Sequence, residues 1–117
     1  MLFICYPKCS TCVKARNWLS ENKIDFEERN IKEHNPTYEE LSEFYRKSGL
    51  PLKKFFNTSG ILYKEMNLKD KLPQMTEEEM LRLLSTDGML VKRPIAVDGN
   101  KVLVGFKESE WEILKGK

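Results

Sequence analysis

The sequence predicts an α/β fold with the element order β, α, β, a helical middle, then β, β, α. Two observations indicate this order. A short apolar strand runs directly into an amphipathic helix near the N-terminus, and two β-branched segments flank a glycine-containing turn near the C-terminus. The length of 117 residues suits one domain, 1–117, and a helical insertion is expected over about 35–88.

The N-terminal half is expected to form a βαβ unit. Residues 2–6 (LFICY) are an apolar run typical of a buried strand. Residues 10–22 have the spacing of an amphipathic helix, with Trp18 on its apolar face and Arg16 away from that face. The partly alternating segment 25–31 then predicts a second, parallel strand.

The middle of the chain is expected to be helical because two capping boxes begin apolar, helix-spaced segments. They are Thr37 with Glu40 and Thr76 with Glu79. The spacing predicts helices over about 37–47 and 76–86. Short helical turns are expected over 55–60 and 67–72.

The C-terminal half is expected to form a hairpin and a helix. Residues 95–97 and 102–104 flank the turn residues 98–101 (DGNK), which is the composition of a tight β-hairpin. Apolar side chains at helical spacing over 106–114 predict the last helix, with Gly116 as its cap.

Composition excludes several classes of function. Twenty basic and eighteen acidic residues leave a net charge of +2, far from the basic excess of a dedicated nucleic-acid binder. The apolar run at the N-terminus is too short for a signal-peptide core or a membrane span. We therefore expect a cytoplasmic protein with no membrane partner and no direct nucleic-acid partner. In that reducing compartment, close cysteines are more often catalytic, redox-sensing or metal-binding than structural.

Cys9 and Cys12 lie in Cys-Ser-Thr-Cys at the predicted strand-to-helix junction. Unpaired N–H groups and the helix dipole stabilise a thiolate there, so Cys9 is expected to be unusually acidic. Lys8 adds a nearby positive charge, and Ser10 and Thr11 are short polar residues that can donate hydrogen bonds to sulfur. Cys12 lies about one helical turn further on and can close a disulfide ring with Cys9. The expected chemistry is thiol–disulfide exchange, in which Cys9 attacks and Cys12 resolves.

Two alternatives to a redox dithiol remain open. Structural zinc usually takes four ligands, and the further soft or imidazole candidates are Cys5 and His34, so no metal is the favoured prediction. The two cysteines of the motif could also simply pack as small hydrophobic residues. Cys5 itself is expected to pack in the core of the first strand, and His34 to be a solvated loop residue.

Arg93-Pro94 is the second candidate feature. A proline that opens a strand can be held cis, which exposes the backbone before it to a neighbouring loop. Arg93 could then bind an anion or stabilise the thiolate. The alternative is a surface arginine before a turn proline.

Several segments together resemble the arsenate reductase (ArsC)/Spx family. They are YPKCSTC at 6–12, FNTSG at 56–60, LKDKL at 68–72, KRPI at 92–95 and VGF at 104–106. The resemblance extends over essentially the whole chain. It implies a thioredoxin-like fold, a mixed four-stranded sheet with the helical insertion between its βαβ and ββα halves.

The resemblance also bears on the site. In the glutaredoxin-coupled arsenate reductases, a cysteine at the position of Cys9 reacts and an arginine at the position of Arg93 helps to bind the oxyanion. Those enzymes add further arginines, whereas the matching stretches here, 57–60 and 104–106, hold none. Cys12 resembles the second cysteine of the Spx branch and of thioredoxin-like oxidoreductases. The leading hypothesis is an oxidoreductase with no bound cofactor, acting on a protein disulfide or a small oxidised substrate and recharged by glutathione, glutaredoxin or thioredoxin.

Two further functions follow from the same resemblance. Spx-like proteins are redox-controlled regulators that bind the C-terminal domain of the RNA polymerase α subunit, and a glycine in the insertion is important to that contact. Gly49 lies in a comparable stretch, although a helix-terminating glycine is the alternative there. An arsenate reductase proper carries lower weight, because fewer fork-shaped arginine donors weaken the binding of a multivalent anion.

Overall fold

The computed structural model describes residues 1–115. Its strands are β1 (Leu2–Cys5), β2 (Glu27–Asn30), β3 (Ile95–Asp98) and β4 (Lys101–Val104). Its α-helices are α1 (Ser10–Glu21), α2 (Tyr38–Ser48), α3 (Ile61–Glu65), α4 (Leu68–Lys71), α5 (Glu77–Leu84) and α6 (Glu108–Trp111). Short 3₁₀ turns are η1 (Leu52–Phe55), η2 (Leu72–Gln74), η3 (Gly88–Leu90) and η4 (Glu112–Lys115). The predicted cap at Gly116 lies outside the described residues.

The four strands form one mixed sheet in the order β2-β1-β3-β4. β1 pairs in parallel with β2 and antiparallel with β3, which in turn pairs antiparallel with β4. This confirms the predicted mixed α/β sheet. The hairpin turn is tighter than predicted, because Asp98 pairs with Lys101 and only Gly99 and Asn100 remain between the strands. Gly99 has a φ of 60° there, which glycine adopts without steric cost.

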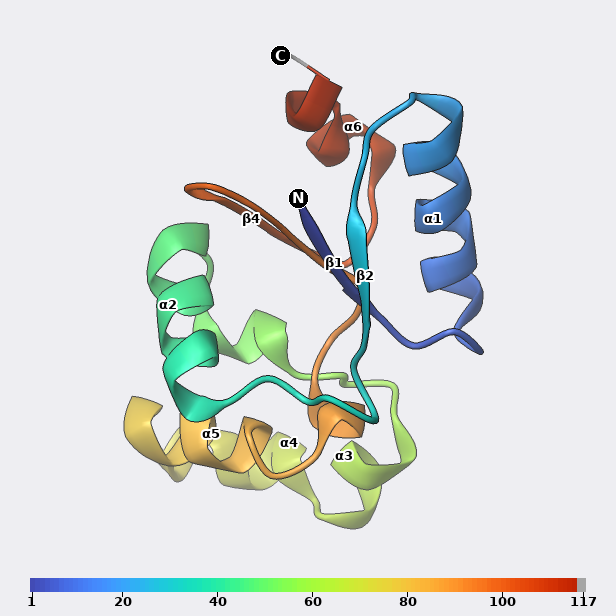
Figure 1. The fold of residues 1–117 in the computed structure, drawn as a ribbon. Coiled ribbons are helices and arrows are strands. Elements are labelled where there is room, and N and C mark those ends of the chain that lie inside the picture. Colours follow the sequence, from blue (N-terminus) through green and yellow to red (C-terminus); the bar gives the residue numbers. More distant parts are fainter. Residues whose placement is uncertain (116–117) are drawn as a thin grey trace.

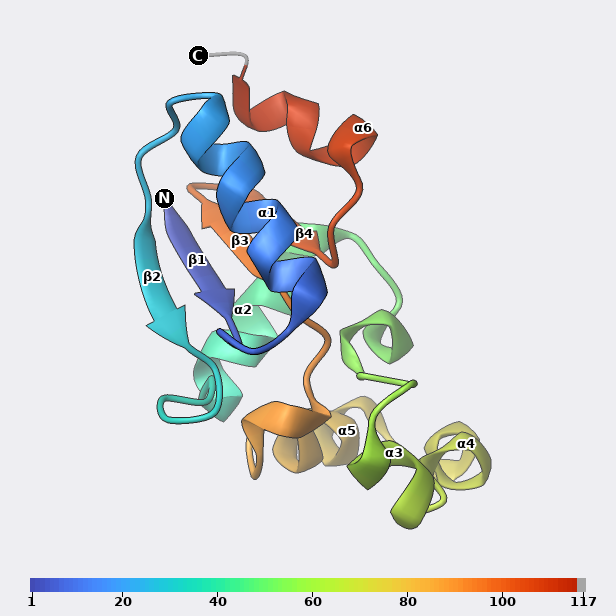
Figure 2. The same cartoon turned by 90° about the vertical axis from the view of Figure 1, so that its right-hand side faces the viewer.

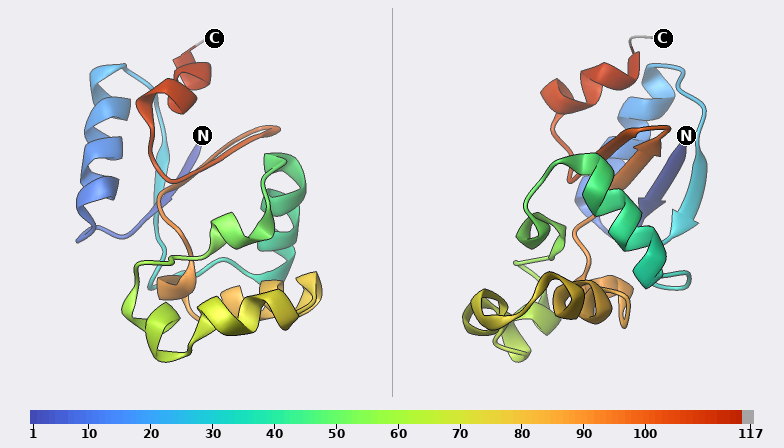
Figure 3. Two further views of the ribbon diagram at one scale, coloured as in Figure 1. Left: turned by 180° about the vertical axis from the view of Figure 1, so that it is seen from behind. Right: turned by 90° about the vertical axis from the view of Figure 1, so that its left-hand side faces the viewer.

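Helices cover both faces of the sheet, as Figures 1 and 2 show. α1 and α6 lie on one face, α2 lies on the other, and the helices α3, α4 and α5 lie beyond one end of the strands (Figure 3). Side chains of a strand alternate between faces, so Phe3 and Cys5 pack with the α1 cluster and Ile4 packs with the insertion. The result is that the dithiol helix lies directly against β1.

Trp111 anchors the last helix to this first face. Its side chain is 0% exposed, and its Nε1–H donates to the carbonyl of Gly105 at 3.0 Å. The rings of Phe3 and Phe106 meet it edge-on, at centroid distances of 6.2 Å and 5.1 Å. Phe106 thus packs onto α6 from the segment before it. The helix begins at Glu108, two residues later than the apolar spacing suggested.

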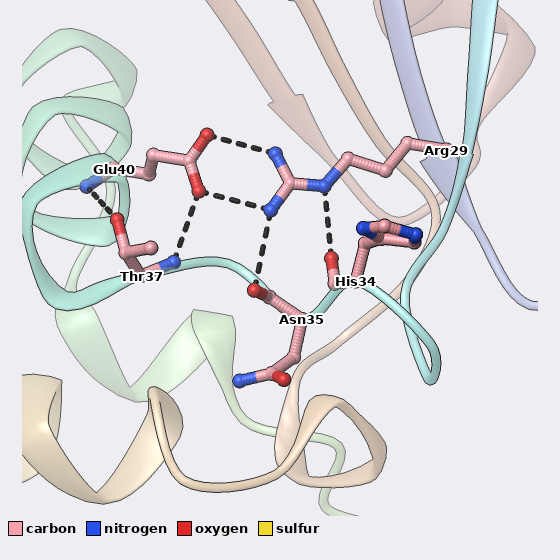
Figure 4. A network of polar contacts seen from close by, with 5 residues as sticks. All are labelled: Arg29, His34, Asn35, Thr37 and Glu40. Carbon is pink, nitrogen blue, oxygen red and sulfur yellow. Dashed lines mark hydrogen bonds and ion pairs between the residues drawn. The ribbon is translucent and has the colours of Figure 1, made fainter.

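The loop from β2 to α2 is tied together by Arg29, as Figure 4 shows. Its guanidinium donates to both carboxylate oxygens of Glu40, at 2.7 and 2.9 Å, and to the carbonyls of His34 and Asn35, at 2.8 and 3.2 Å. Glu40 also completes the predicted capping box with Thr37. His34 is exposed and takes part through its backbone, which agrees with its predicted place in a loop.

The rest of the insertion links two segments that are distant in the sequence, around residues 56–57 and 90–91. The second predicted capping box also forms, and α5 ends at Leu84, slightly earlier than predicted. The segment 55–60, predicted as a short helical turn, begins at the end of η1, contains a bridge from Phe56 to Val91 and a turn at 58–59, and is followed by α3. The amide of Asn57 donates to the carbonyl of Leu90 at 2.8 Å. Two distant segments are thereby held side by side. In residues 1–115, no helix has the length and apolar character needed to cross a bilayer.

Candidate functional site

Cys9 is the residue immediately before α1 and its backbone starts the helix. Its carbonyl accepts from the amide of Val13 at 3.0 Å, and its own amide donates to the carbonyl of Tyr6 at 2.9 Å. Partial burial alone would raise the pKa of the Cys9 thiol. The backbone N–H groups of Cys12 and Thr11, the Cys12 thiol and the positive charge of Arg93 outweigh burial and lower that pKa. The accessible sulfur of the pair is therefore the more acidic one.

Cys12 occupies the opposite environment, behind Cys9 and against β1. Its side chain is 0% exposed, and the amide of Tyr6 donates to its sulfur at 3.3 Å. The hydrogen bond from the Cys12 thiol to Cys5 raises the pKa of Cys12, and burial raises it further. The three cysteines are free thiols in the structure. The motif thus holds one accessible thiol with a lowered pKa and one buried thiol with a raised pKa.

Arg93 approaches this pair from the segment just before β3. The Arg93-Pro94 peptide bond is cis, and the guanidinium lies over the ring of Tyr6, 5.3 Å from its centroid. Its Nε and Nη1 atoms are buried without a hydrogen-bond partner among residues 1–115. Arg93 therefore belongs to the site and is not a free surface arginine. Its unpaired donors are suited to a negatively charged group, because charge-assisted hydrogen bonds are the strong ones.

Cys9 and Arg93 line one cleft with a volume of about 470 Å³. Its walls come from the turn before α1, from segment 57–62 and from segment 89–93. Of the other predicted site residues, Thr11 lines the cleft, whereas Lys8 and Ser10 are exposed. Thr11 acts through its backbone N–H, where the sequence suggested its hydroxyl.

The cleft includes side chains that no sequence motif marked as functional. Ile61 is 74% exposed at the cleft, and Leu62, Met89 and Lys92 also line it. In the sequence, the segments around 56–60 and 92–95 stand out only as family-like stretches. Their small and polar residues were the available signal, but only the bridge between the two segments brings them to Cys9.

Cys5 is buried in the core, as predicted, yet it also has polar neighbours. Nη2 of Arg16 lies 3.7 Å from its sulfur. The hydrogen bond from Cys12 lowers the pKa of Cys5, Arg16 lowers it too, and burial and the charge of Glu28 oppose them. Arg16 is not among the buried residues of α1, as predicted, but its long side chain reaches back across the edge of the helix to Cys5. Within residues 1–115, no three His, Cys, Asp or Glu side chains gather as a metal site.

Gly49 ends α2 in the left-handed conformation, with a φ of 69°. It is exposed, and a Cβ added there would meet nothing within 4 Å. This is the geometry of a helix-terminating glycine. The adjacent residues Ser48 and Leu50 line a second hollow, which shares Thr11 and Lys92 with the Cys9 cleft.

Comparison with known proteins identifies the family of this chain. The sequence profile of the ArsC family matches residues 5–114. The chain belongs to the ArsC family. It is 56% identical over 112 residues to the uncharacterized protein YusI of Bacillus subtilis, covering 96% of this chain and 95% of YusI. It is 33% identical over 105 residues to the global transcriptional regulator Spx of Enterococcus faecalis, covering 89% and 77%.

A solved structure supports the fold of this ArsC-family chain directly. The crystal structure of an ArsC family related protein from Bacteroides fragilis has a TM-score of 0.95 and 59% identity, covering 97% of this chain and 95% of that one. The thioredoxin-like fold expected from the resemblance is therefore confirmed. Family membership does not by itself choose between enzyme and regulator, so that choice depends on the site.

Proposed function

We propose that this ArsC-family protein is a thiol–disulfide oxidoreductase that cycles Cys9 and Cys12. The observation that carries the proposal is the contrast between the two thiols. Cys9 lies in a cleft and its pKa is lowered, whereas Cys12 is 0% exposed directly behind it and its pKa is raised. Such a pair favours attack by the first sulfur and a second, slower step by the other.

The exchange proceeds in two displacements. The Cys9 thiolate attacks one sulfur of a substrate disulfide, forms a mixed disulfide and releases the other half as a thiolate. Cys12 then loses its proton and attacks the Cys9 sulfur, which forms the Cys9–Cys12 disulfide and releases the bound half. Two electrons from cellular thiols return the pair to its reduced state. Glutathione, glutaredoxin or thioredoxin is the proposed reductant.

The cleft supports a substrate that is both negatively charged and partly apolar. Arg93 has two unpaired buried donors there, and Lys92 adds a second cation. Ile61 places an exposed apolar side chain at the same cleft. A protein disulfide beside an acidic side chain, or glutathione disulfide with its carboxylates, has this combination.

A trapping experiment tests the proposal. Replacing Cys12 by serine blocks resolution, so substrates should accumulate as mixed disulfides on Cys9 in oxidatively stressed cells. The double variant Cys9→Ser with Cys12→Ser is the matched control, because it has the same fold and no cleft thiol. Capture no greater than that of the double variant would count against an oxidoreductase.

A redox-controlled regulator is the second candidate, as the likeness to Spx suggests. One observation favours it: the hollow beside Gly49 shares Thr11 and Lys92 with the Cys9 cleft, so oxidation of the dithiol could alter a surface near Gly49. The proposed partner is the C-terminal domain of the RNA polymerase α subunit. Titration calorimetry with the reduced and the oxidised protein tests this, and binding in neither state removes the idea.

Arsenate reduction remains the third and weakest candidate. Asn57 and Ser59 line the cleft beside the single guanidinium of Arg93, so a multivalent oxyanion finds few charged donors. We expect little arsenate-dependent oxidation of glutathione when purified glutaredoxin is supplied. Turnover comparable to that with a disulfide substrate would reverse this ranking.

A further inference from the structure

A third thiol lies next to the redox pair and has no role in the two displacements described above. Cys5 ends β1 on the face that packs against α1, and it is 0% exposed like Cys12. Cys5 and Cys12 belong to the same buried cluster, in which the Cys12 thiol can donate a hydrogen bond to the Cys5 sulfur. Cys9, Cys12 and Cys5 therefore follow one another from the cleft into the core.

Charged side chains continue this line from Cys5 to the surface. Nη2 of Arg16 lies 3.7 Å from the Cys5 sulfur, and the same guanidinium holds the Glu28 carboxylate through two hydrogen bonds of 2.8 and 3.0 Å. When Cys5 is protonated, its thiol can donate a hydrogen bond to the Glu28 carboxylate, whose side chain is 36% exposed. The groups that face Cys5 are thus Cys12 and Arg16 from α1 and Glu28 from β2.

Resolution by Cys12 raises a proton problem that this line of side chains answers. Cys12 must become a thiolate to attack, yet it is fully buried and cannot give its proton directly to bulk water. The Cys12 thiol has one proton, and the sulfurs of both Cys9 and Cys5 are within its hydrogen-bonding reach. Once Cys9 is in a mixed disulfide, it carries no charge, and Cys5 is the remaining sulfur that attracts the proton.

Building on the proposed thiol–disulfide exchange, we propose that Cys5 is the proton acceptor for Cys12, and that Arg16 and Glu28 position Cys5 and connect it to solvent. As Cys12 forms its bond to the Cys9 sulfur, the bond from Cys9 to the substrate sulfur breaks and its electron pair leaves with the substrate thiolate. The Cys12 proton moves to the Cys5 thiolate and then, past Glu28, to water. No further oxidant or reductant is required.

Removing either of the two charges near Cys5 should shift the pH dependence of resolution, and the two shifts should have opposite directions. Arg16 favours the Cys5 thiolate, whereas the negative charge of Glu28 opposes it. Arg16→Gln should therefore move the pH dependence of resolution to higher pH. Glu28→Gln keeps an oxygen that can accept from Arg16 and removes the charge, so it should move that dependence to lower pH. A purely structural role of the two residues would not produce opposite shifts.

A chromogenic aryl disulfide that releases thionitrobenzoate separates the two displacements in one stopped-flow trace. The first equivalent released reports the attack by Cys9, and the second reports resolution by Cys12. Cys5→Ser keeps the shape of the side chain and replaces the sulfur by the smaller, far less acidic hydroxyl. We expect a first phase within about twofold of wild type and a second phase slowed about tenfold or more at neutral pH, in line with the usual size of proton-transfer contributions. Lys14→Gln, an exposed change on the same helix, is the matched control and should alter neither phase.

The outcomes separate this inference from the proposed function. If wild type shows both phases while Cys5→Ser leaves the second phase and its pH dependence unchanged, Cys5 is not the proton acceptor. Shifts of the same sign in Arg16→Gln and Glu28→Gln overturn the assigned roles of those residues, and these surface variants remain informative even if Cys5→Ser folds poorly. A wild-type protein that releases no second equivalent overturns the exchange itself, and the proton path with it.

Discussion

Among the glycines of residues 1–115, Gly88 is the one where we expect a change to alanine to destabilise the fold most. It begins η3 and packs against the end of β2, where an added Cβ would lie 1.9 Å from the carbonyl oxygen of Ile31 and 2.7 Å from its carbonyl carbon. Real Cβ atoms essentially never approach closer than 3.0 Å, so Gly88→Ala must separate the two backbones by about 1.1 Å. Both partners are main chain, so no rotamer change can relieve the clash.

The expected cost can be converted into a melting temperature. Overpacking typically costs about 1–3 kcal/mol, and the upper end, about 3 kcal/mol, applies because backbone must move. Unfolding entropy near 2.1 cal/mol/K per residue gives about 0.25 kcal/mol/K for a chain of 117 residues. Gly88→Ala should therefore lower Tm by about 12 °C in a calorimetric or circular-dichroism melt.

Gly49→Ala is the matched control because it tests a different cost. Its Cβ would meet nothing within 4 Å, but the residue has a φ of 69°. The left-handed conformation costs a non-glycine residue about 1 kcal/mol, which corresponds to a Tm lower by about 4 °C. If Gly88→Ala melts within a few degrees of wild type, or above Gly49→Ala, then the close contact between η3 and β2 is not the constraint described here.

Three further predictions concern the site and the core. The rate of Cys9 alkylation by iodoacetamide, followed by mass spectrometry over a pH series, should have a midpoint below the ordinary thiol value of about 8.5. The reason is that the lowered pKa of Cys9 leaves more thiolate as the pH falls. A midpoint at or above that value contradicts the assigned environment of Cys9. In Arg93→Met, the midpoint of Cys9 alkylation should rise and alkylation at neutral pH should slow by a factor of a few, because one positive charge near the thiolate is lost. An unchanged midpoint would show that Arg93 does not act on the thiolate. Trp111→Phe should lower the free energy of unfolding, measured in urea, by about 2 kcal/mol, because the buried carbonyl of Gly105 loses its hydrogen-bond donor. A loss under about 0.5 kcal/mol would mean that the structure repacks around the phenylalanine.

Features that depend on near neighbours in the sequence were predicted well. The capping boxes at Thr37 and Thr76 form as expected, because each satisfies helix N–H groups through residues only three positions apart. The β-hairpin before α6 was predicted for the same reason, since its turn residues lie between the strands they join. The short segment over 61–65 was missed because nothing local distinguishes α3 from a loop. Its place depends on the distant bridge from Phe56 to Val91.

The sequence by itself therefore determined the cysteine motif: two cysteines three residues apart at a strand-to-helix junction, with Cys9 at the helix N-terminus and Cys12 one turn inside. Only the tertiary structure decided what surrounds that motif. Pairing of β3 with β1 brings Arg93 to Cys9, and packing of α1 on β1 places Cys5 and Arg16 behind Cys12. The physical reason is range. Capping and helix-dipole effects act within one helical turn, whereas the charge and burial that separate the pKa values of the two thiols come from residues that meet only when the sheet has formed.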